Sequence, residues 1–432
     1  MMFRNLKKAL KRWRPLFVAA EVRNAIRRCL RSIGYEWRIH QEVTVPAIGP
    51  ERGRALFSYR IEGFVMADDD PLMKTHTNYW QSRQMVRTLS ELGFTVDVID
   101  YRNARFVPEK KYDVFVDVRN NMERLAPLLG DGCLKIFHID TAHLLANNAG
   151  EAVRLRELAD RRRVALQARR FEQPSRGIEF ADRATGNAGP FAVRTHEYAG
   201  TPIHPLPAPV AQLHDWPADK DWERCRSRFL WMGSGGLVHK GLDLVLEAFA
   251  LLPDCHLTVC APLDSEPDFK RAFHRELYDS PNVDAVGWVD VEGEQFRKIL
   301  GSCGALVYPS CSEGLSTSTI ECMHAGLIPI MSPETGIPAE DFGVELGDCS
   351  VAGIRQAVQE VADLPPEEFR DRARRAWKHA RAHHTRDHFA SVYRDVMTRL
   401  LSEHGLIENP PETTPPRRHD ADERPLAAQS SG

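Results

Sequence analysis

Long apolar runs, paired cysteines and net charge are all scarce in this sequence of 432 residues. No stretch of about 18 apolar residues occurs, so no membrane-spanning helix is expected. The basic N-terminus has no uninterrupted apolar core behind it, which argues against a secretory signal. The nine cysteines form no C-x-x-C pair, and no His-rich metal spacing accompanies them. The sequence therefore predicts a reduced, cytoplasmic protein without structural disulfides or zinc.

The formal net charge is only −3, which argues against a general nucleic-acid-binding protein, but the charge is unevenly spread. Residues 1–40 hold eleven Lys or Arg and two Glu, a net of +9, which leaves −12 for the rest of the chain. A chain of this length is expected to form two domains of about 200 residues each. Its 43% hydrophobic and 27% charged residues are typical of a soluble globular protein.

The basic segment at the N-terminus is predicted to form amphipathic helices. Apolar residues such as Leu6, Leu10 and Trp13 recur at helical spacing, opposite a face of Lys and Arg. Such a segment suits an anionic membrane surface, which would make the protein peripheral on the inner face of the membrane. The alternative is helices packed on a domain, with the basic face in water. The sequence leaves both possibilities open.

Residues 305–337 combine a strand, a polar turn, a helix and a second strand. The apolar run 305–309 has the length and composition of a buried strand. A short helix is expected over 319–325, ended by Gly326, and the run 327–331 is the next strand. The order predicts a βαβ unit of a parallel sheet, whose ligands bind at the carboxyl ends of the strands.

Two carboxylates, Glu313 and Glu321, bracket the turn between this strand and its helix, with seven residues between them. A helix start offers unpaired N–H groups and a positive dipole end, which suit phosphate. An ionised carboxylate only accepts hydrogen bonds, so it can take both hydroxyls of a sugar diol. The spacing alone could arise by chance, and a helix dipole favours an early Glu without any function. The combination with the βαβ pattern indicates a nucleotide-sugar site.

A glycine-rich turn, residues 233–241, follows the predicted strand 228–232. Gly235 and Gly236 would let the backbone approach a phosphate closely. Lys240 would add a point charge for a diphosphate. A plain tight turn is the alternative for the glycines. The pairing of this turn with the two glutamates about seventy residues later favours phosphate binding.

These motifs resemble the Glu-x7-Glu motif and glycine-rich loop of retaining glycosyltransferases of the GT-B fold, the family 4 group. The resemblance is strong over 228–337 and loose before residue 200. It implies an α/β fold with two Rossmann-like, doubly wound domains that face each other across a cleft. It also implies that Glu313 faces the transferred sugar and that Glu321 holds the nucleotide ribose.

The same resemblance assigns further donor contacts. The backbone of Gly314, Leu315 and Ser316 would lie along the sugar and the diphosphate. The family usually carries an Arg a few residues before the lysine, but here Ser234 or Gly235 stands in that place. His239, directly before Lys240, is the candidate to help neutralise the negative charge of the diphosphate.

In the first domain, His143 follows the predicted strand 134–140 at its carboxyl end, the edge at which such sheets bind their ligands. In the family, a histidine near this point often faces the cleft, so His143 is a candidate catalytic residue. A helix-capping or structural role is the alternative, and His76 has a similar claim to the site. Residues 151–172 are expected to form an Arg-rich helix with a solvated basic face, turned toward an acidic acceptor.

We therefore predict a hexosyltransferase that moves a sugar from a nucleotide-sugar to a hydroxyl of a glycan or lipid-linked acceptor, with retention, in bacterial surface-glycan assembly. The predicted catalytic residues are His143, Lys240 and Glu313, and no cofactor, metal or nucleic acid is expected. A nucleotide-sugar 2-epimerase of the same fold and a non-catalytic, membrane-docked scaffold are the alternatives. The expected parts are basic helices (1–50), an acceptor domain (51–205), a linker (206–226), a donor domain (227–385), a helix that crosses back (386–405) and a disordered tail (406–432).

Overall fold

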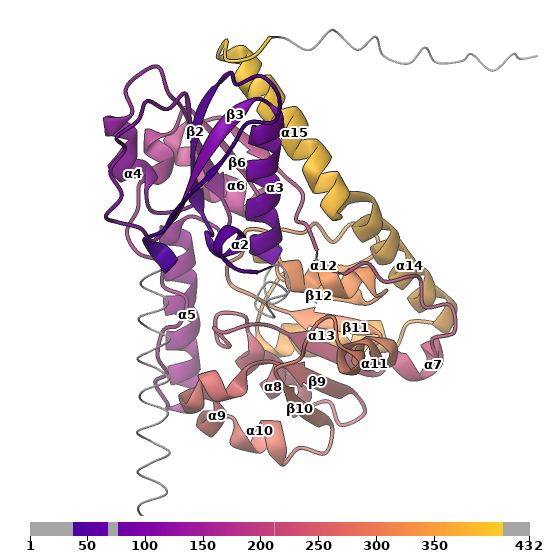
Figure 1. The fold of residues 1–432 in the computed structure, drawn as a ribbon. Coiled ribbons are helices and arrows are strands. Elements are labelled where there is room, and N and C mark those ends of the chain that lie inside the picture. Colours follow the sequence, from indigo (N-terminus) through magenta and orange to yellow (C-terminus); the bar gives the residue numbers. More distant parts are fainter. Residues whose placement is uncertain (1–37, 68–76, 211, 409–432) are drawn as a thin grey trace, which may run out of the picture.

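The computed structural model describes residues 38–67, 77–210 and 212–408. The basic stretch 1–37 lies outside the described residues, as do His76 and the part of the tail after residue 408. The chain forms two α/β domains, each built around its own sheet (Figure 1). Within the described ranges, no helix is both long enough and apolar enough to cross a membrane.

The first sheet has the strand order β1-β3-β2-β4-β5-β6-β7. All its pairs are parallel except β1 with β3, so β1 is an antiparallel edge strand. This edge strand precedes the predicted domain start at residue 51. The strands are β1 (Glu42–Val45), β2 (Gly53–Tyr59), β3 (Phe94–Asp100), β4 (Val114–Asp117), β5 (Leu134–Ile139), β6 (Arg183–Gly186) and β7 (Ile203–Pro205).

The second sheet has the order β10-β9-β8-β11-β12-β13 and is parallel throughout. In each sheet the order reverses next to the first strand of its parallel set, as in doubly wound folds. The strands are β8 (Arg228–Met232), β9 (His256–Cys260), β10 (Val283–Gly287), β11 (Ala305–Tyr308), β12 (Ile328–Met331) and β13 (Val344–Glu345).

Helices cover both sheets. In the first half of the chain they are α2 (Glu62–Val65), α3 (Thr77–Glu91), α4 (Met122–Leu125), α5 (Leu144–Arg162) and α6 (Pro190–His196), with 3-10 turns Ala126–Leu128, Gly177–Phe180 and Glu197–Ala199. Later ones are α7 (Trp222–Cys225), α8 (Leu242–Phe249), α9 (Pro267–Ala272), α10 (His274–Tyr278), α11 (Glu294–Ser302), α12 (Thr317–His324), α13 (Val351–Ala362), α14 (Pro366–His383) and α15 (Arg386–Glu403), with 3-10 turns Leu263–Ser265 and Pro333–Thr335.

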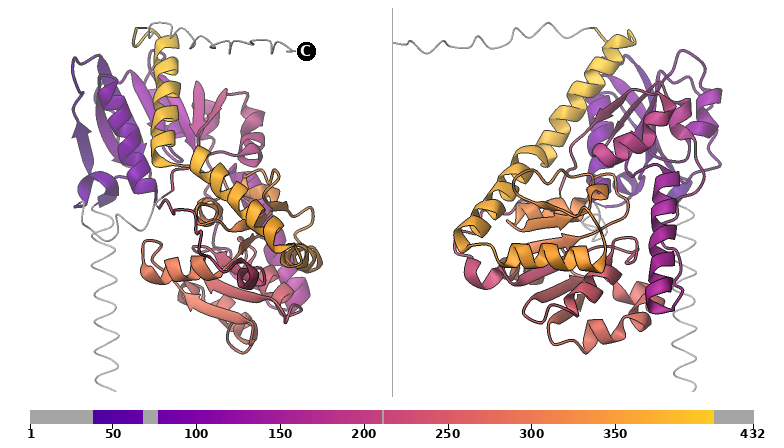
Figure 2. Two further views of the ribbon diagram at one scale, coloured as in Figure 1. Left: turned by 90° about the vertical axis from the view of Figure 1, so that its right-hand side faces the viewer. Right: turned by 180° about the vertical axis from the view of Figure 1, so that it is seen from behind.

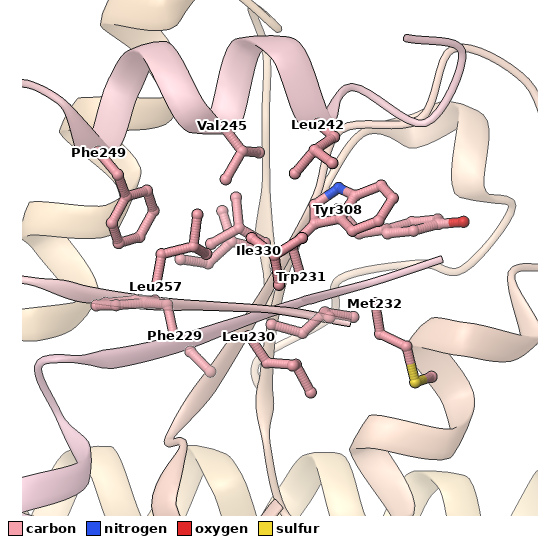
Figure 3. Packing of buried hydrophobic residues seen from close by; sticks show 14 of the residues in the cluster. Phe229, Leu230, Trp231, Met232, Leu242, Val245, Phe249, Leu257, Tyr308 and Ile330 are labelled. Carbon is pink, nitrogen blue, oxygen red and sulfur yellow. The ribbon is translucent and has the colours of Figure 1, made fainter. Parts of the chain in front are cut away.

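The core of the second domain shows why its strands are apolar on both faces. Helix α8 directs Leu242, Val245 and Phe249 at the sheet, with Leu242 nearest Trp231 (Figure 3). The ring of Phe249 packs on that of Phe229. Leu230, the neighbour of Trp231 in β8, extends to the opposite face of the sheet (Figure 3). Because helices cover both faces, alternate residues of the strand are all buried, and β8 is a nearly continuous apolar run.

Helix α15 crosses from the second domain back to the first and packs beside α3 (Figures 1 and 2). Its apolar face, which includes Phe389, Tyr393 and Met397, is buried in the core of the first domain. Arg394 of α15 also pairs with Glu91 of α3. This helix therefore ties the end of the chain to the domain with which it begins.

Helix α5 crosses in the other direction. It leaves the first sheet after β5 and runs down beside the second domain, near α9 (Figure 1). Leu158 of α5 is fully buried in the core of the second domain. Arg161 pairs with Asp243 over 2.7 Å, and Arg162 pairs with Glu276 over 2.6 Å.

The expected solvated basic face of the 151–172 helix is therefore wrong for these arginines. Three of them (Arg161, Arg162 and Arg169) pair with carboxylates of the second domain. We call residues 144–170 the strap, because they belong to the chain of the first sheet and dock on the second domain.

Candidate functional site between the two domains

A cavity of about 300 Å³ lies between the carboxyl edges of the two sheets. We call it the central cavity. From the second domain it is lined by Ser234, Lys240, Tyr308 and residues 313–318. From the first-sheet part of the chain it is lined by Tyr59, Arg60, Thr77, Asn78, Tyr101, Arg119, Asp140, Arg170 and Asn187. A ligand in this cavity would contact both halves of the molecule.

Three glycines let the two domains meet beside the central cavity. The Gly189 N–H donates a hydrogen bond to the Gly314 carbonyl over 3.0 Å. A Cβ at Gly189 would lie 1.9 Å from the Gly336 carbonyl oxygen, and one at Gly314 would lie 2.7 Å from the Asn187 carbonyl oxygen. Only glycine permits backbones to approach so closely, so these positions bring the two sheet edges together.

Lys240 and Glu313 form a buried ion pair in the central cavity. Lys240 Nζ lies 2.6 Å from Glu313 Oε1, and the two side chains are 6% and 14% exposed. The same carboxylate oxygen accepts hydrogen bonds from Tyr308 OH (3.2 Å) and Ser310 Oγ (3.0 Å). Among the described residues, Oε2 of Glu313 accepts none of these bonds, so it is available to a ligand hydroxyl.

The surroundings keep Glu313 ionised. Burial alone would raise the pKa of Glu313, but the nearby cations Lys240 and Arg170 lower it to about 2. Burial also lowers the pKa of Lys240, and Glu313 opposes that shift. The pair is therefore present as a carboxylate and an ammonium, each of which needs the other while the cavity holds no anion.

A second cavity of about 410 Å³ adjoins the first. We call it the outer cavity. The two share Thr77, Ser234, Thr317 and Ser318. Glu321 lines the outer cavity, together with Gly233 and the exposed ring of Trp288. The Oε1 atom of Glu321 is buried without a hydrogen-bond partner among the described residues, and His214 Nε2 lies 3.5 Å from it.

Helix α12 begins where the two cavities join. Ser316 is its N-cap, with Oγ accepting from the Thr319 N–H at 3.3 Å. Thr317 and Ser318 are the first two residues of the helix, so their N–H groups have no intrahelical acceptor. Gly314, Leu315 and Ser316 line the central cavity, where the sequence analysis expected donor contacts.

The glycine-rich turn presents less backbone to the cavities than its sequence suggests. The N–H groups of Gly236 and Leu237 both donate to the carboxylate of Glu266, so neither is free for a phosphate. Gly235 lies against the same carboxylate, because a Cβ there would be 3.5 Å from Glu266 Oε1. Neither Gly235 nor Gly236 lines the central or the outer cavity.

His239 is buried under the turn and lies 2.8 Å from the Ser312 carbonyl through Nε2. Burial lowers the pKa of His239 to about 4, so the ring is neutral at pH 7 and donates to that carbonyl. A neutral imidazole held in this way supplies no positive charge to a diphosphate. The family's arginine, absent here at Ser234 or Gly235, is therefore not replaced by His239. If a diphosphate binds here, a second cation beside Lys240 must come from another segment.

His143 lies outside both cavities and lines a small neighbouring one of about 60 Å³. It is the N-cap of α5, and Nδ1 accepts from the Leu145 N–H at 3.4 Å. Nε2 lies 3.2 Å from Tyr198 OH, and burial lowers the pKa of His143. This geometry is that of a helix cap, the alternative that the sequence left open, and a catalytic role for His143 stays a prediction.

The first-domain residues that do line the central cavity were not singled out from the sequence. Asp140 directly follows β5, so the sheet-edge argument that pointed to His143 could have pointed to Asp140 as well. Asp140 accepts from Arg119 over 3.1 Å, and Arg119 follows β4 at the same edge. Arg170 lies in the Arg-rich stretch 151–172, which was expected to face solvent, and no strand end or turn motif distinguishes it from the other arginines there.

The described residues contain no cluster of three or more His, Cys, Asp or Glu that could hold a metal ion. The eight cysteines in the described ranges are all free. The expected absence of a metal and of a cofactor stays a prediction.

The sequence of the second domain matches a known family. Residues 226–363 fit the family model described as Glycosyl transferases group 1. Over these residues the chain is therefore similar to group 1 glycosyl transferases. The domain contains Lys240, Glu313 and Glu321, so the ion pair and the outer-cavity carboxylate belong to the matched segment. None of the curated protein sequences matches the chain.

Solved structures share the complete two-domain fold. Sucrose-phosphate synthase from Thermosynechococcus elongatus superposes with a TM-score of 0.55 at 15% identity, covering 81% of this chain and 100% of that one. An α,α-trehalose-phosphate synthase (UDP-forming) from Burkholderia vietnamiensis gives 0.53 at 12% identity, covering 82% and 98%. At these identities the likeness shows the fold alone. The expected GT-B architecture of two Rossmann-like domains is confirmed.

Proposed function

We propose that this protein transfers a hexosyl unit from a nucleotide-sugar to an acceptor hydroxyl, with retention of the anomeric configuration. The observation that carries the proposal is the pair of adjoining cavities. The outer cavity, with Glu321 and Trp288, suits a nucleoside, since a carboxylate can take the ribose diol. The central cavity, with Lys240 and Glu313, suits a diphosphate and a sugar.

The proposed chemistry uses groups of this chain at the point where charge develops. Loss of the nucleoside diphosphate leaves negative charge on the phosphate oxygens. Lys240 Nζ and the free N–H groups at the start of α12 would stabilise that charge. Glu313 would accept a hydroxyl of the transferred sugar through Oε2. In a front-face displacement the acceptor oxygen bonds to the anomeric carbon, the carbon–phosphate oxygen bond breaks, and the departing phosphate takes the acceptor's proton.

The acceptor would enter from the first-domain side of the central cavity. That wall carries the tyrosines Tyr59 and Tyr101 and the ion pair of Arg119 with Asp140. A sugar acceptor fits such a wall, because it offers both aromatic surface and hydrogen-bonding groups. Glycan or lipid-linked acceptors of bacterial surface-glycan assembly, a cytoplasmic site and contact of residues 1–40 with the membrane remain parts of this proposal.

Asp140 also keeps the epimerase hypothesis in view, because that reaction needs further acid–base carboxylates in the cleft. Asp140 is such a carboxylate, although Arg119 already pairs with it. The two reactions differ in products. A transferase gives a glycosylated acceptor, whereas a 2-epimerase gives an epimeric sugar with no acceptor present. Product analysis by NMR with and without acceptor separates them, and the anomeric coupling of a transfer product tests retention.

The first experiment is thermal unfolding with UDP, GDP, ADP and the matching nucleotide-sugars, with and without magnesium. A ligand at a hundred times its dissociation constant stabilises the folded state by about 2.7 kcal/mol, which raises the melting temperature by about 5 °C. We expect one base to give this shift on the wild type and none on Glu321→Ala. Glu345→Ala, on an exposed edge strand, is the matched control and should retain the shift. Absence of any shift on the wild type would refute the proposal.

A further inference from the structure

Four cations line the central cavity, and three of them already have acidic partners. Arg60 lies 3.7 Å from Glu62, Arg119 pairs with Asp140 and Glu172, and Lys240 pairs with Glu313. The fourth is Arg170. Within the described ranges its guanidinium makes no ion pair or hydrogen bond, and its Nε is buried without a partner.

The backbone around Arg170 is held firmly. Its N–H donates to both oxygens of Glu151 at 3.1 and 2.9 Å, and its carbonyl accepts from Asn147 Nδ2 at 2.7 Å. Both partners are buried residues of α5. The position of Arg170 at the end of the strap is therefore fixed by the helix that precedes it.

The side chain of Arg170 lies over the glycine-rich turn. A Cβ at Gly236 would be 2.4 Å from Arg170 Cγ and 2.9 Å from its Cδ. Gly236 also has a φ of +88°, which an L side chain rarely adopts. The absence of a side chain at Gly236 thus leaves the space that the aliphatic part of Arg170 occupies. The charge of Arg170 also contributes to the lowered pKa of Glu313.

We infer that Arg170, delivered by the strap, is a second cation that binds the diphosphate of the donor beside Lys240. It would replace the arginine that the sequence lacks at Ser234 or Gly235. This inference rests on the proposed function, since it concerns the donor of that same site.

The physical reason is the cost of the unpaired charge. Arg170 is half-buried, and its Nε is buried without a hydrogen-bond partner among the described residues. Its neighbour Lys240 is also positive, and Glu313 is already committed to that lysine. An anion with several oxygens can bind both cations at once, and the planar fork of an arginine suits phosphate oxygens.

The strap also explains why a residue from the first sheet's part of the chain can serve the donor half. Ion pairs anchor the strap to the second domain at Arg161, Arg162 and Arg169. Arg170 directly follows the last of these. If the two domains move relative to each other, Arg170 is expected to stay with Lys240, so the diphosphate site remains complete.

The test is calorimetric titration of the folded full-length chain with UDP, GDP and ADP, each compared with its monophosphate. Arg170→Gln should weaken binding of the preferred diphosphate by about ten- to a hundredfold, the range of one charge-assisted contact. Binding of the monophosphate should change less. Arg170→Lys keeps the charge and should recover part of the affinity. Arg156→Gln, which removes an arginine of the strap with a side chain that is 85% exposed and lines neither cavity, is the matched control and should bind as the wild type does.

A purely structural role for Arg170 makes a different prediction. In that case Arg170→Gln would lower the melting temperature of the unliganded protein. If Arg170 is instead an unpaired cation beside Lys240, its loss should leave that melting temperature unchanged or raise it. Equal diphosphate affinity in wild type and Arg170→Gln would overturn the inference while leaving the proposed function intact. If the wild type bound no nucleoside diphosphate at all, both proposals would fall.

Discussion

The two walls of the central cavity are built in different ways. The second-domain wall comes mainly from two short segments, 234–240 and 308–318, each following a strand of one sheet. The first-domain wall collects single residues from segments far apart in the chain. These are residues 59–60, 77–78, 101, 119, 140, 170 and 187.

This difference affects how each wall can change. In the second-domain wall one atom, Glu313 Oε1, accepts from Lys240, Tyr308 and Ser310, so a substitution at one residue disturbs the others. In the first-domain wall Arg170 is held by its own backbone contacts, so its side chain can be substituted without disturbing another residue of that wall. We expect donor binding to be intolerant of substitution in the second-domain wall and at Arg170, and acceptor preference to be adjustable at the other positions of the first-domain wall.

The largest effect is expected from breaking the second-domain wall at Lys240. Lys240→Met should lower turnover of the donor by about a hundred- to a thousandfold, because a preorganised cation no longer meets the leaving phosphate. It should also lower the free energy of unfolding by about 3 kcal/mol, because Glu313 is left buried and unpaired. Initial rates and urea unfolding measure the two losses.

A double variant separates these two losses. Lys240→Met with Glu313→Gln removes both charges, so most of the stability should return while turnover stays low. Lys298→Met, an exposed lysine on α11, is the control and should behave as the wild type. A Lys240→Met variant with normal turnover would exclude Lys240 from the leaving-group site.

The next effect concerns the ion pair between Arg161 of the strap and Asp243 of the second domain. Burial raises the pKa of Asp243 to about 6, although Arg161 opposes the shift. That value lies above the ordinary carboxyl value of about 3.9. The folded protein therefore binds the extra proton between these two values, and the contribution of Asp243 to stability falls as the pH rises through that window.

Arg161→Leu should therefore cost more at high pH than at low pH. At pH 8 the substitution leaves Asp243 buried without its partner, either ionised or protonated at a free-energy cost. We expect the free energy of unfolding to fall by about 3 kcal/mol. At pH 5 Asp243 is largely protonated, and the loss should be about 1 kcal/mol. Urea unfolding at both pH values measures this difference. Arg156→Leu, with a side chain that is 85% exposed on the same helix, should show almost no loss at either pH. Equal losses at both pH values for Arg161→Leu would contradict the assignment.

The smallest effect is expected at His143, which lies outside both walls. His143→Ala should cost about 1 kcal/mol in stability, the usual value of a helix N-cap. It should lower turnover less than about tenfold, whereas a general acid or base would contribute about a hundredfold or more. His143→Asn keeps a capping group without an imidazole and should restore the stability. A hundredfold loss of turnover in both variants would instead establish the predicted catalytic role.

Local patterns in the sequence were sufficient for the fold class and for the second-domain wall. The βαβ order over 305–331 predicts β11, α12 and β12, because each element is specified by neighbouring residues. The same locality puts Glu313 and Glu321 on either side of a helix start. The contact of Lys240 with Glu313 follows from the parallel sheet, since β8 and β11 are adjacent and their following turns share one edge.

The edge strand β1 and the strap were beyond such patterns. Four residues, Glu42–Val45, are too few to show a clear period, and only pairing with β3 makes them a strand. The arginines of α5 were expected to face water, as charged residues usually do. Their partners Asp243 and Glu276 lie 82 and 114 residues further along the chain, so no window of sequence contains both members of a pair.

The sequence by itself determined the parallel strands of the two sheets, their order along the chain and the turns that bring Lys240 and Glu313 to one sheet edge. Tertiary structure alone decided which residues of the first-sheet segments line the central cavity. The physical reason is that apolar periodicity, helix caps and glycine turns are specified by residues within a few positions of one another. The position of Arg170 beside Lys240 depends on packing and ion pairs between segments that meet only when both domains have folded.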